Sequence, residues 1–441
     1  MQLFGGSDLG WRIYDFALLA SLTLAMIAIS RTYDWLAGLF AGVTFALVHA
    51  NDGPWNSVER DEIMTVLVFI GYAFLFESLR RRKSWYLLGF GLSLGVATTI
   101  KPTAAPLGIL LLIMAAWRVR KEGRPAGPSL WYGLSGALIA VLISLEFLVR
   151  HHALQACIQN IKTYTPFYAR LDQADIATLL RFMPKKVELA MLPFALAVTL
   201  RQKGWNGWER AALLLGVLFG AFSYLQQAKG YDYHRYPVAA FVLLWMSIEL
   251  ALAMREAGWR RWIGAAGFTA GLLVGAPPYL HHVAEFQADS DFVPLQQDLV
   301  LLGTERLQRK VQCMDVVQGC YAALYHLKLV QSSGMIGDIL LFSPRKSPAV
   351  DSLRDWYWNQ LTSNPPVAIV VTNEWFEHYP SFKKLEQWPR FSQYLRDHYN
   401  LVIERNVSED VNSAYRLQQT DHAYRIYLRK EIAVRPPGKS G

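Results

Sequence analysis

The sequence predicts an all-α membrane domain of about ten transmembrane helices, followed by a C-terminal extramembrane α/β domain. Three observations predict this fold class. Hydrophobic residues make up 53% of the 441-residue chain and charged residues only 18%, whereas soluble domains carry about 25% charged residues. Long apolar runs recur through residues 1–282 and stop there. The following residues alternate short apolar stretches with polar ones, which is typical of a small globular domain.

Ten apolar runs account for the membrane domain. A run of roughly 17–25 apolar residues crosses a bilayer as a helix, because lipid offers no hydrogen-bond partner to an exposed backbone. Two of the runs, 103–117 and 188–200, are the shortest. The predicted spans are 13–30, 33–50, 62–79, 84–100, 103–117, 130–149, 188–200, 211–226, 237–254 and 262–280.

The net charge of +9 lies entirely in residues 1–282, since 18 Lys and Arg balance 18 Asp and Glu from residue 283 onward. A charge excess confined to the apolar part indicates a membrane protein, so we expect no nucleic-acid partner. Basic residues gather in alternate connections, which the positive-inside rule places in the cytoplasm. They are Arg80, Arg81, Arg82 and Lys83; Arg118, Arg120, Lys121 and Arg124; Arg201, Lys203 and Arg210; and Arg255, Arg260 and Arg261.

The opposite connections are expected outside the cell membrane, together with the tail from about residue 283. They are 51–61, the turn at Lys101, the long loop 150–187, and 227–236. An even number of spans then places the N-terminus outside as well, although no signal peptide precedes it. We therefore expect a further helix ahead of the first span in the complete protein.

We expect residues 283–430 to form a periplasmic α/β domain. Residues 431–441 are expected to form a disordered tail. The apolar stretches predict strands at 338–342, 367–371 and 401–405, with a helix over 381–399 around Pro389.

The chain has three cysteines, two of them in this domain. Cys313 and Cys320 form a disulfide if residues 313–320 fold back tightly, and remain two reduced thiols if they do not. Both readings stay open, and Cys157 is left unpaired.

Two polar groups stand at expected external connections, where charge is costly unless it is paired or functional. The acidic loop NDGPWNSVERDE contributes Asp52, Glu59, Asp61 and Glu62. Asp61 suits a proton acceptor or a divalent-ion ligand, and the alternative is a solvated helix cap.

The segment TTIKP contributes Thr98, Thr99, Lys101 and Pro102. Its ammonium suits a phosphate, and the alternative is a lysine that snorkels to the interface.

Two further groups combine cations with aromatic rings. The segment KGYDYHRYP contributes Lys229, Tyr231, Tyr233, His234, Arg235 and Pro237. These types suit an anionic head group with a sugar stacked on tyrosine, whereas the alternative is an interfacial aromatic belt. The loop 150–187 is basic and is either a lipid-facing segment or a gate for a donor lipid. Its adjacent His151 and His152 are poorly spaced for one metal ion.

The motifs GPWNSVERDE, TIKP and GYDYHRYP occur in this order on one predicted face, and in this the sequence resembles the GT-C superfamily of polyprenyl-phosphate-sugar glycosyltransferases. The resemblance covers roughly residues 3–282 and is greatest to bacterial members similar to protein mannosyltransferases and the lipid A aminoarabinose transferase. In that family a first helix and a long external loop carry an acidic residue regarded as the catalytic base. No position of this sequence matches that residue.

The resemblance implies that the chain moves a sugar from a polyprenyl-phosphate donor to a periplasmic acceptor, with inversion at the anomeric carbon. It implies that Asp61 and Lys101 are catalytic, Lys101 as the donor-phosphate contact. Substrate-binding residues would be Glu62, Lys229, Tyr231, Tyr233, His234 and Arg235. It further implies a multi-pass protein of the bacterial inner membrane. Some members of the superfamily use a divalent metal ion, and the sequence leaves open whether this chain does.

Two other function classes compete with a transferase. One is a non-catalytic or truncated relative that binds a glycan or a partner. The other is a lipid-linked sugar transporter, which would carry paired charges at the membrane midplane. The acidic residues Glu146 and Glu249 lie near predicted span ends instead, which disfavours a transporter.

Overall fold

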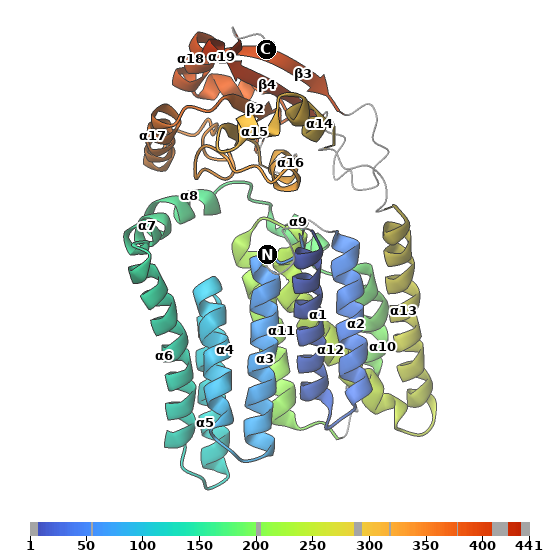
Figure 1. Ribbon diagram of the computed structural model, residues 1–441. Coiled ribbons are helices and arrows are strands. Elements are labelled where there is room, and N and C mark those ends of the chain that lie inside the picture. Colours follow the sequence, from blue (N-terminus) through green and yellow to red (C-terminus); the bar gives the residue numbers. More distant parts are fainter. Residues whose placement is uncertain are drawn as a thin grey trace. The chain divides into compact units, whose positions relative to one another are not determined.

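A computed structural model describes residues 8–53, 56–199, 204–285, 293–316, 319–376, 378–407 and 422–433. The chain divides into two compact units, shown in Figure 1. The first unit comprises residues 1–160 and 172–284, and the second comprises 161–171 and 285–441. The basic residues Arg201 and Lys203, and residues 434–441 of the tail predicted over 431–441, lie outside the described residues. Residues 431–433 of that predicted tail are helical.

The first unit is a bundle of helices, and each predicted apolar run coincides with one of them (Figure 1). The long helices are α1 (Asp8–Ser30), α2 (Trp35–Asp52), α3 (Arg60–Arg80), α4 (Tyr86–Ile100), α5 (Ala104–Lys121), α6 (Gly127–Arg150), α10 (Lys186–Thr199), α11 (Gly207–Gln227), α12 (Tyr236–Met254) and α13 (Trp259–Glu285). Short segments of the first unit are α7 (Leu154–Gln159), α9 (Ile176–Phe182) and the 3₁₀ helix η4 (Asp232–Arg235). Helix α8 (Thr165–Ala169) belongs to the second unit, and a π-helix (Asn160–Tyr164) spans the boundary between the two segments of chain.

Five of the described helical segments are long and apolar enough to cross a membrane. They are Leu9–Ser30, Arg60–Arg80, Gly127–Arg150, Gly207–Gln227 and Asp232–Met254. The mostly helical, multi-span character predicted from the sequence is therefore present, whereas the total of ten spans stays a prediction.

Helix α12 forms the core of this bundle. Almost all of its side chains are buried, and it packs against α2, α3, α10 and α11. Helix α6 is the opposite case, because apolar side chains such as Leu134, Ile143 and Phe147 are exposed along it. An apolar surface of this length is unfavourable in water and is suited to lipid.

Helices α4 and α6 approach each other closely through glycines. A Cβ atom at Gly91 would lie 1.9 Å from the carbonyl oxygen of Gly133, and one at Gly136 would lie 2.2 Å from the carbonyl oxygen of Leu88. Small residues let membrane helices pack backbone to backbone, where van der Waals contact replaces the hydrophobic driving force. The packing of these two helices therefore requires glycine.

The second unit contains a four-stranded sheet with the strand order β1-β2-β4-β3. Strands β1 (Val311–Met314) and β2 (Ala368–Thr372) are parallel, and β4 (Ala423–Arg429) runs antiparallel to both β2 and β3 (Tyr399–Asn406). Its helices are α14 (Val293–Leu301), α15 (Thr304–Leu307), α16 (Cys320–His326), α17 (Pro348–Ser363), α18 (Pro389–His398), α19 (Lys430–Ala433) and the 3₁₀ helix η5 (Phe382–Gln387).

Side-chain alternation along β2 explains why both faces of this sheet are covered. Ala368 and Val370 pack in one apolar cluster with residues of α14 and α16. Ile369 and Val371 pack in another cluster with residues of α17 and α18. Because successive side chains of a strand point to opposite faces, a continuous apolar run such as VAIVV indicates a strand that is buried on both sides.

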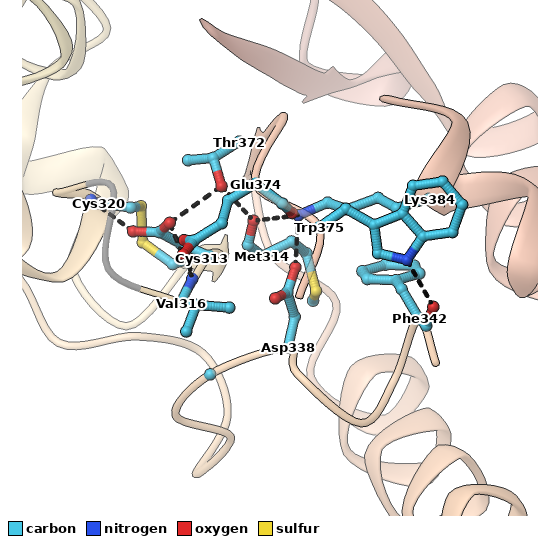
Figure 2. A network of polar contacts seen from close by, with 12 residues as sticks. Cys313, Met314, Val316, Cys320, Asp338, Phe342, Thr372, Glu374, Trp375 and Lys384 are labelled. Carbon is cyan, nitrogen blue, oxygen red and sulfur yellow. Dashed lines mark hydrogen bonds and ion pairs between the residues drawn. A yellow bond between two sulfur atoms is a disulfide. The ribbon is translucent and has the colours of Figure 1, made fainter. Parts of the chain in front are cut away.

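The predicted strand at 338–342 is wrong, because these residues form turns. Asp338 is buried and its carboxylate accepts a hydrogen bond from Lys384 Nζ at 2.6 Å (Figure 2). The amide of Leu341 donates to the Asp338 carbonyl, which closes a turn, while Leu341 and Phe342 enter the apolar core. The apolar run thus reflects burial and not extended backbone.

The remaining expectations for this unit have mixed outcomes. The strand expected at 367–371 appears as β2, the one at 401–405 lies within β3, and η5 and α18 occupy the predicted helix around Pro389. Strands β1 and β4 were not predicted. Cys313 and Cys320 form a disulfide (Figure 2), and Cys157 is free.

We predict that Gly91→Ala lowers the free energy of unfolding by about 1–3 kcal/mol, because a Cβ atom there forces α4 away from α6. Thermal unfolding of the purified protein in detergent measures the effect. Gly127→Ala is the matched control, since no atom lies within 4 Å of a Cβ at that position. Equal unfolding temperatures for the two variants would contradict the close approach.

Candidate functional site

Local backbone preferences bring three helix ends to one end of the bundle. Helix α3 begins at Arg60 and carries Asp61 and Glu62 in its first turn, where acidic side chains are favourable. Helix α4 ends at Ile100, and Lys101 is extended with φ of −139°, because the residue before a proline disfavours helical backbone. Helix α11 ends at Gln227, where Ala228 adopts the left-handed conformation.

Asp61, Lys101 and Gln227 meet at these ends. Lys101 Nζ donates to both carboxylate oxygens of Asp61 and to Gln227 Oε1, each at 2.6 Å. Gln227 Nε2 also lies 3.3 Å from Asp61 Oδ1. The Asp61 side chain is fully buried, whereas 15% of the Lys101 side chain is exposed. The structure thus brings together the two residues predicted to be catalytic.

This geometry contradicts the two alternative interpretations, a solvated helix cap for Asp61 and a lysine at position 101 that snorkels to the interface. Asp61 is not a solvated helix cap, because its carboxylate is buried beneath Lys101. Lys101 does not simply snorkel, because all three hydrogen-bond acceptors of its ammonium are side-chain oxygens of the bundle. Burial lowers the pKa of Lys101 from its ordinary value, and the charge of Asp61 opposes that shift.

A second ion-paired group lies around Asp52, the last residue of α2. Its buried carboxylate forms ion pairs with Lys185 Nζ at 2.8 Å and with Arg235. Lys185 also contacts Asp232 at 2.9 Å. Arg235 is buried and its Nη2 donates to Asp52, whereas its Nε and Nη1 have no hydrogen-bond partner among the described residues; its substrate-binding role stays a prediction.

The other predicted substrate residues of KGYDYHRYP surround η4. The rings of Tyr231 and Tyr233 lie 5.7 Å apart, and the His234 ring is 4.5 Å from that of Tyr233. Tyr231 donates to Asp172 at 2.9 Å. Lys229 precedes this aromatic group at the partly buried turn after α11. Their substrate-binding role stays a prediction.

Glu62 has different neighbours from Asp61, although the two are adjacent in sequence. Its carboxylate accepts a hydrogen bond from the Val58 amide at 2.7 Å and lies close to Asp15 and His49. Glu62 is thus apart from Lys101, and its predicted role in substrate binding rests on the sequence motif alone.

Sequence reasoning missed Gln227, Asp15 and His49, and it did not single out Lys185 among the cations of its loop. Gln227 lies two residues before the KGYDYHRYP turn. A polar residue at the end of a predicted span was the sequence signal that could have identified it. Lys185 belongs to the basic loop 150–187, but nothing in that loop distinguishes it from the other cations. Asp15 and His49 each stand alone in an apolar run, and only helix packing reveals that they meet.

Buried charge at the other end of the bundle is also paired. Glu209, at the start of α11, binds Arg80 at 2.7 Å and accepts from Tyr33 at 2.8 Å. Arg210 binds Glu249 at 2.8 Å, where α11 begins and α12 ends. These pairs lie at helix ends, as the sequence suggested for Glu249, and not midway along the helices.

The apolar helices and their paired charges define a multi-pass membrane protein. Residues 1–146 match the family model described as dolichyl-phosphate-mannose-protein mannosyltransferase, a family of the GT-C type. The match confirms the resemblance to the GT-C superfamily and supports a membrane glycosyltransferase. No curated protein matches the chain.

We predict that Lys101→Met lowers the free energy of unfolding by about 3–5 kcal/mol, because it strands the buried Asp61 carboxylate. Asp61→Asn added to Lys101→Met should restore most of that loss. Thermal unfolding of the single and double variants measures the coupling. A double variant less stable than Lys101→Met would show that the pair is not coupled as described.

Proposed function

We propose that the chain is an integral membrane glycosyltransferase that moves a sugar from a polyprenyl-phosphate donor to a periplasmic lipid, glycan or protein. The observation that carries this proposal is the contact of Asp61 with Lys101, a buried carboxylate under a partly exposed ammonium. A phosphate that departs with a polyprenyl chain needs a cation, and an acceptor hydroxyl or amine needs a base.

Lys101 is the proposed phosphate clamp. Its three ammonium hydrogens are directed at Asp61 and Gln227, so a donor phosphate would replace the Gln227 oxygen as the third acceptor. Asp61 keeps the ammonium charged and positioned until then. The remaining exposure of the Lys101 side chain gives the phosphate access to its ammonium.

The proposed reaction is a single displacement at the anomeric carbon. The acceptor oxygen or nitrogen forms a bond to this carbon, and the bond from the carbon to the phosphate oxygen breaks. Its electron pair leaves with the polyprenyl phosphate, where Lys101 stabilises the added charge. The acceptor proton passes to a carboxylate, for which Asp61 beside Lys101 is the candidate.

We predict that Asp61→Asn and Lys101→Met each reduce sugar transfer by about 10²–10⁴-fold in proteoliposomes supplied with a polyprenyl-phosphate sugar. Lys101→Arg should retain transfer and extend it to higher pH. The reason is that residue 101 binds the phosphate only while it is charged. Because the pKa of Lys101 is lowered, this lysine loses its charge at a lower pH than a free lysine, whereas an arginine stays charged.

The control is Lys121→Met, an exposed lysine at the end of α5, which should transfer at the wild-type rate. An alkaline limit that is identical in the wild type and Lys101→Arg would refute the clamp. Wild-type transfer by Asp61→Asn would refute the base.

The proposed orientation places the start of α3 on the periplasmic side. We predict that Arg60→Cys reacts with a membrane-impermeant maleimide added to intact spheroplasts, whereas Lys121→Cys reacts only after the membrane is permeabilised. Both positions are exposed in the first unit. The reverse labelling pattern would invert the topology and place the site in the cytoplasm.

A further inference from the structure

Three polar side chains from three different helices converge beside the site described above. They are Asp15 of α1, His49 of α2 and Glu62 of α3. One imidazole nitrogen and one oxygen from each carboxylate lie within 4.8 Å of one another. His49 and Glu62 are buried, and Asp15 is partly buried. The spacing fits three ligand atoms around one small cation.

The carboxylates in this cluster have unsatisfied oxygens. Glu62 Oε2 accepts the amide of Val58 at 2.7 Å, but the buried Glu62 Oε1 has no hydrogen-bond partner among the described residues. Asp15 Oδ1 is likewise without a hydrogen bond there, although His49 Nε2 lies 3.3 Å away. Buried carboxylate oxygens without partners are costly, and two neighbouring carboxylates repel each other. A bound cation removes both costs.

His49 is held in the orientation that a metal ligand requires. Its Nδ1 lies 2.9 Å from the hydroxyl oxygen of Tyr236, a buried residue of α12. This contact leaves Nε2 facing Asp15. Metal-ligating histidines almost always hydrogen-bond their second ring nitrogen to another group, which fixes both the ring and its tautomer.

We propose that Asp15, His49 and Glu62 bind a divalent transition-metal ion, with Zn²⁺ as the species that best fits the donors. Zinc binds imidazole nitrogens and carboxylate oxygens, and three protein ligands leave a fourth position open to water. Mg²⁺ and Ca²⁺ prefer oxygen ligands alone. The ion ties the first half of α1 to the end of α2 and the start of α3. This inference does not rest on the proposed sugar transfer, because Lys101 is not part of the metal cluster.

The test is metal binding by the purified full chain, prepared without a polyhistidine tag and dialysed against a chelator. After reloading with Zn²⁺ and removal of excess ion, mass spectrometry of the metal should give about one Zn²⁺ per wild-type chain. Glu62→Gln and His49→Gln should bring the content to background. Tyr236→Phe should retain the site with about 10–100-fold weaker affinity, as expected when the second partner of a ligating histidine is lost.

The matched control is His151→Gln, because His151 is an exposed histidine of the same unit. It should bind Zn²⁺ as the wild type does. Zn²⁺ should also raise the unfolding temperature of the wild type and of His151→Gln, but not that of Glu62→Gln. The proposal is overturned if the reloaded wild type holds no Zn²⁺, which would indicate a shared proton between the carboxylates. It is equally overturned if Glu62→Gln and His49→Gln hold as much as the wild type.

Discussion

Charge buried in an apolar bundle must be paired, and this constraint organises the first unit. Asp61 is covered by Lys101, Asp52 by Arg235 and Lys185, and Glu209 by Arg80. Each pair joins elements that are distant in the chain and lies where helices end. An isolated charge at such a position would cost several kcal/mol. Pairing therefore fixes which helix ends meet, and the same contacts create the polar surface on which chemistry is proposed.

The ion pairs of the bundle differ in how completely their polar atoms are satisfied. Arg80 and Glu209 are held by a full set of hydrogen bonds that includes Tyr33 and the carbonyls of Ala28 and Ile29. This pair has the properties of a structural clasp. By contrast, Lys101 is partly exposed and Glu62 Oε1 is unsatisfied. Incomplete satisfaction is expected where a ligand completes the contacts, because a substrate phosphate or a metal ion then replaces protein partners.

Sequence reasoning located the helices well and the site in part. Apolar runs predict helix positions because lipid and packing impose the same pattern on every span. Asp61 and Lys101 were identifiable because both are charged residues at a span boundary. Asp61 belongs to an acidic loop, and Lys101 directly precedes Pro102. Gln227, Asp15 and His49 were not identifiable, because their importance depends on the packing of α11, α1 and α2. The strand predicted at 338–342 failed because a buried turn with Leu341 and Phe342 has the composition of a strand.

The most direct measurement of the central claim is an experimental structure of the chain in lipid with polyprenyl phosphate bound. The account predicts a phosphate oxygen within about 3 Å of Lys101 Nζ, with Gln227 displaced from the ammonium and Asp61 still beside it. A phosphate bound elsewhere, with the contacts of Lys101 to Asp61 and Gln227 unchanged, would contradict it.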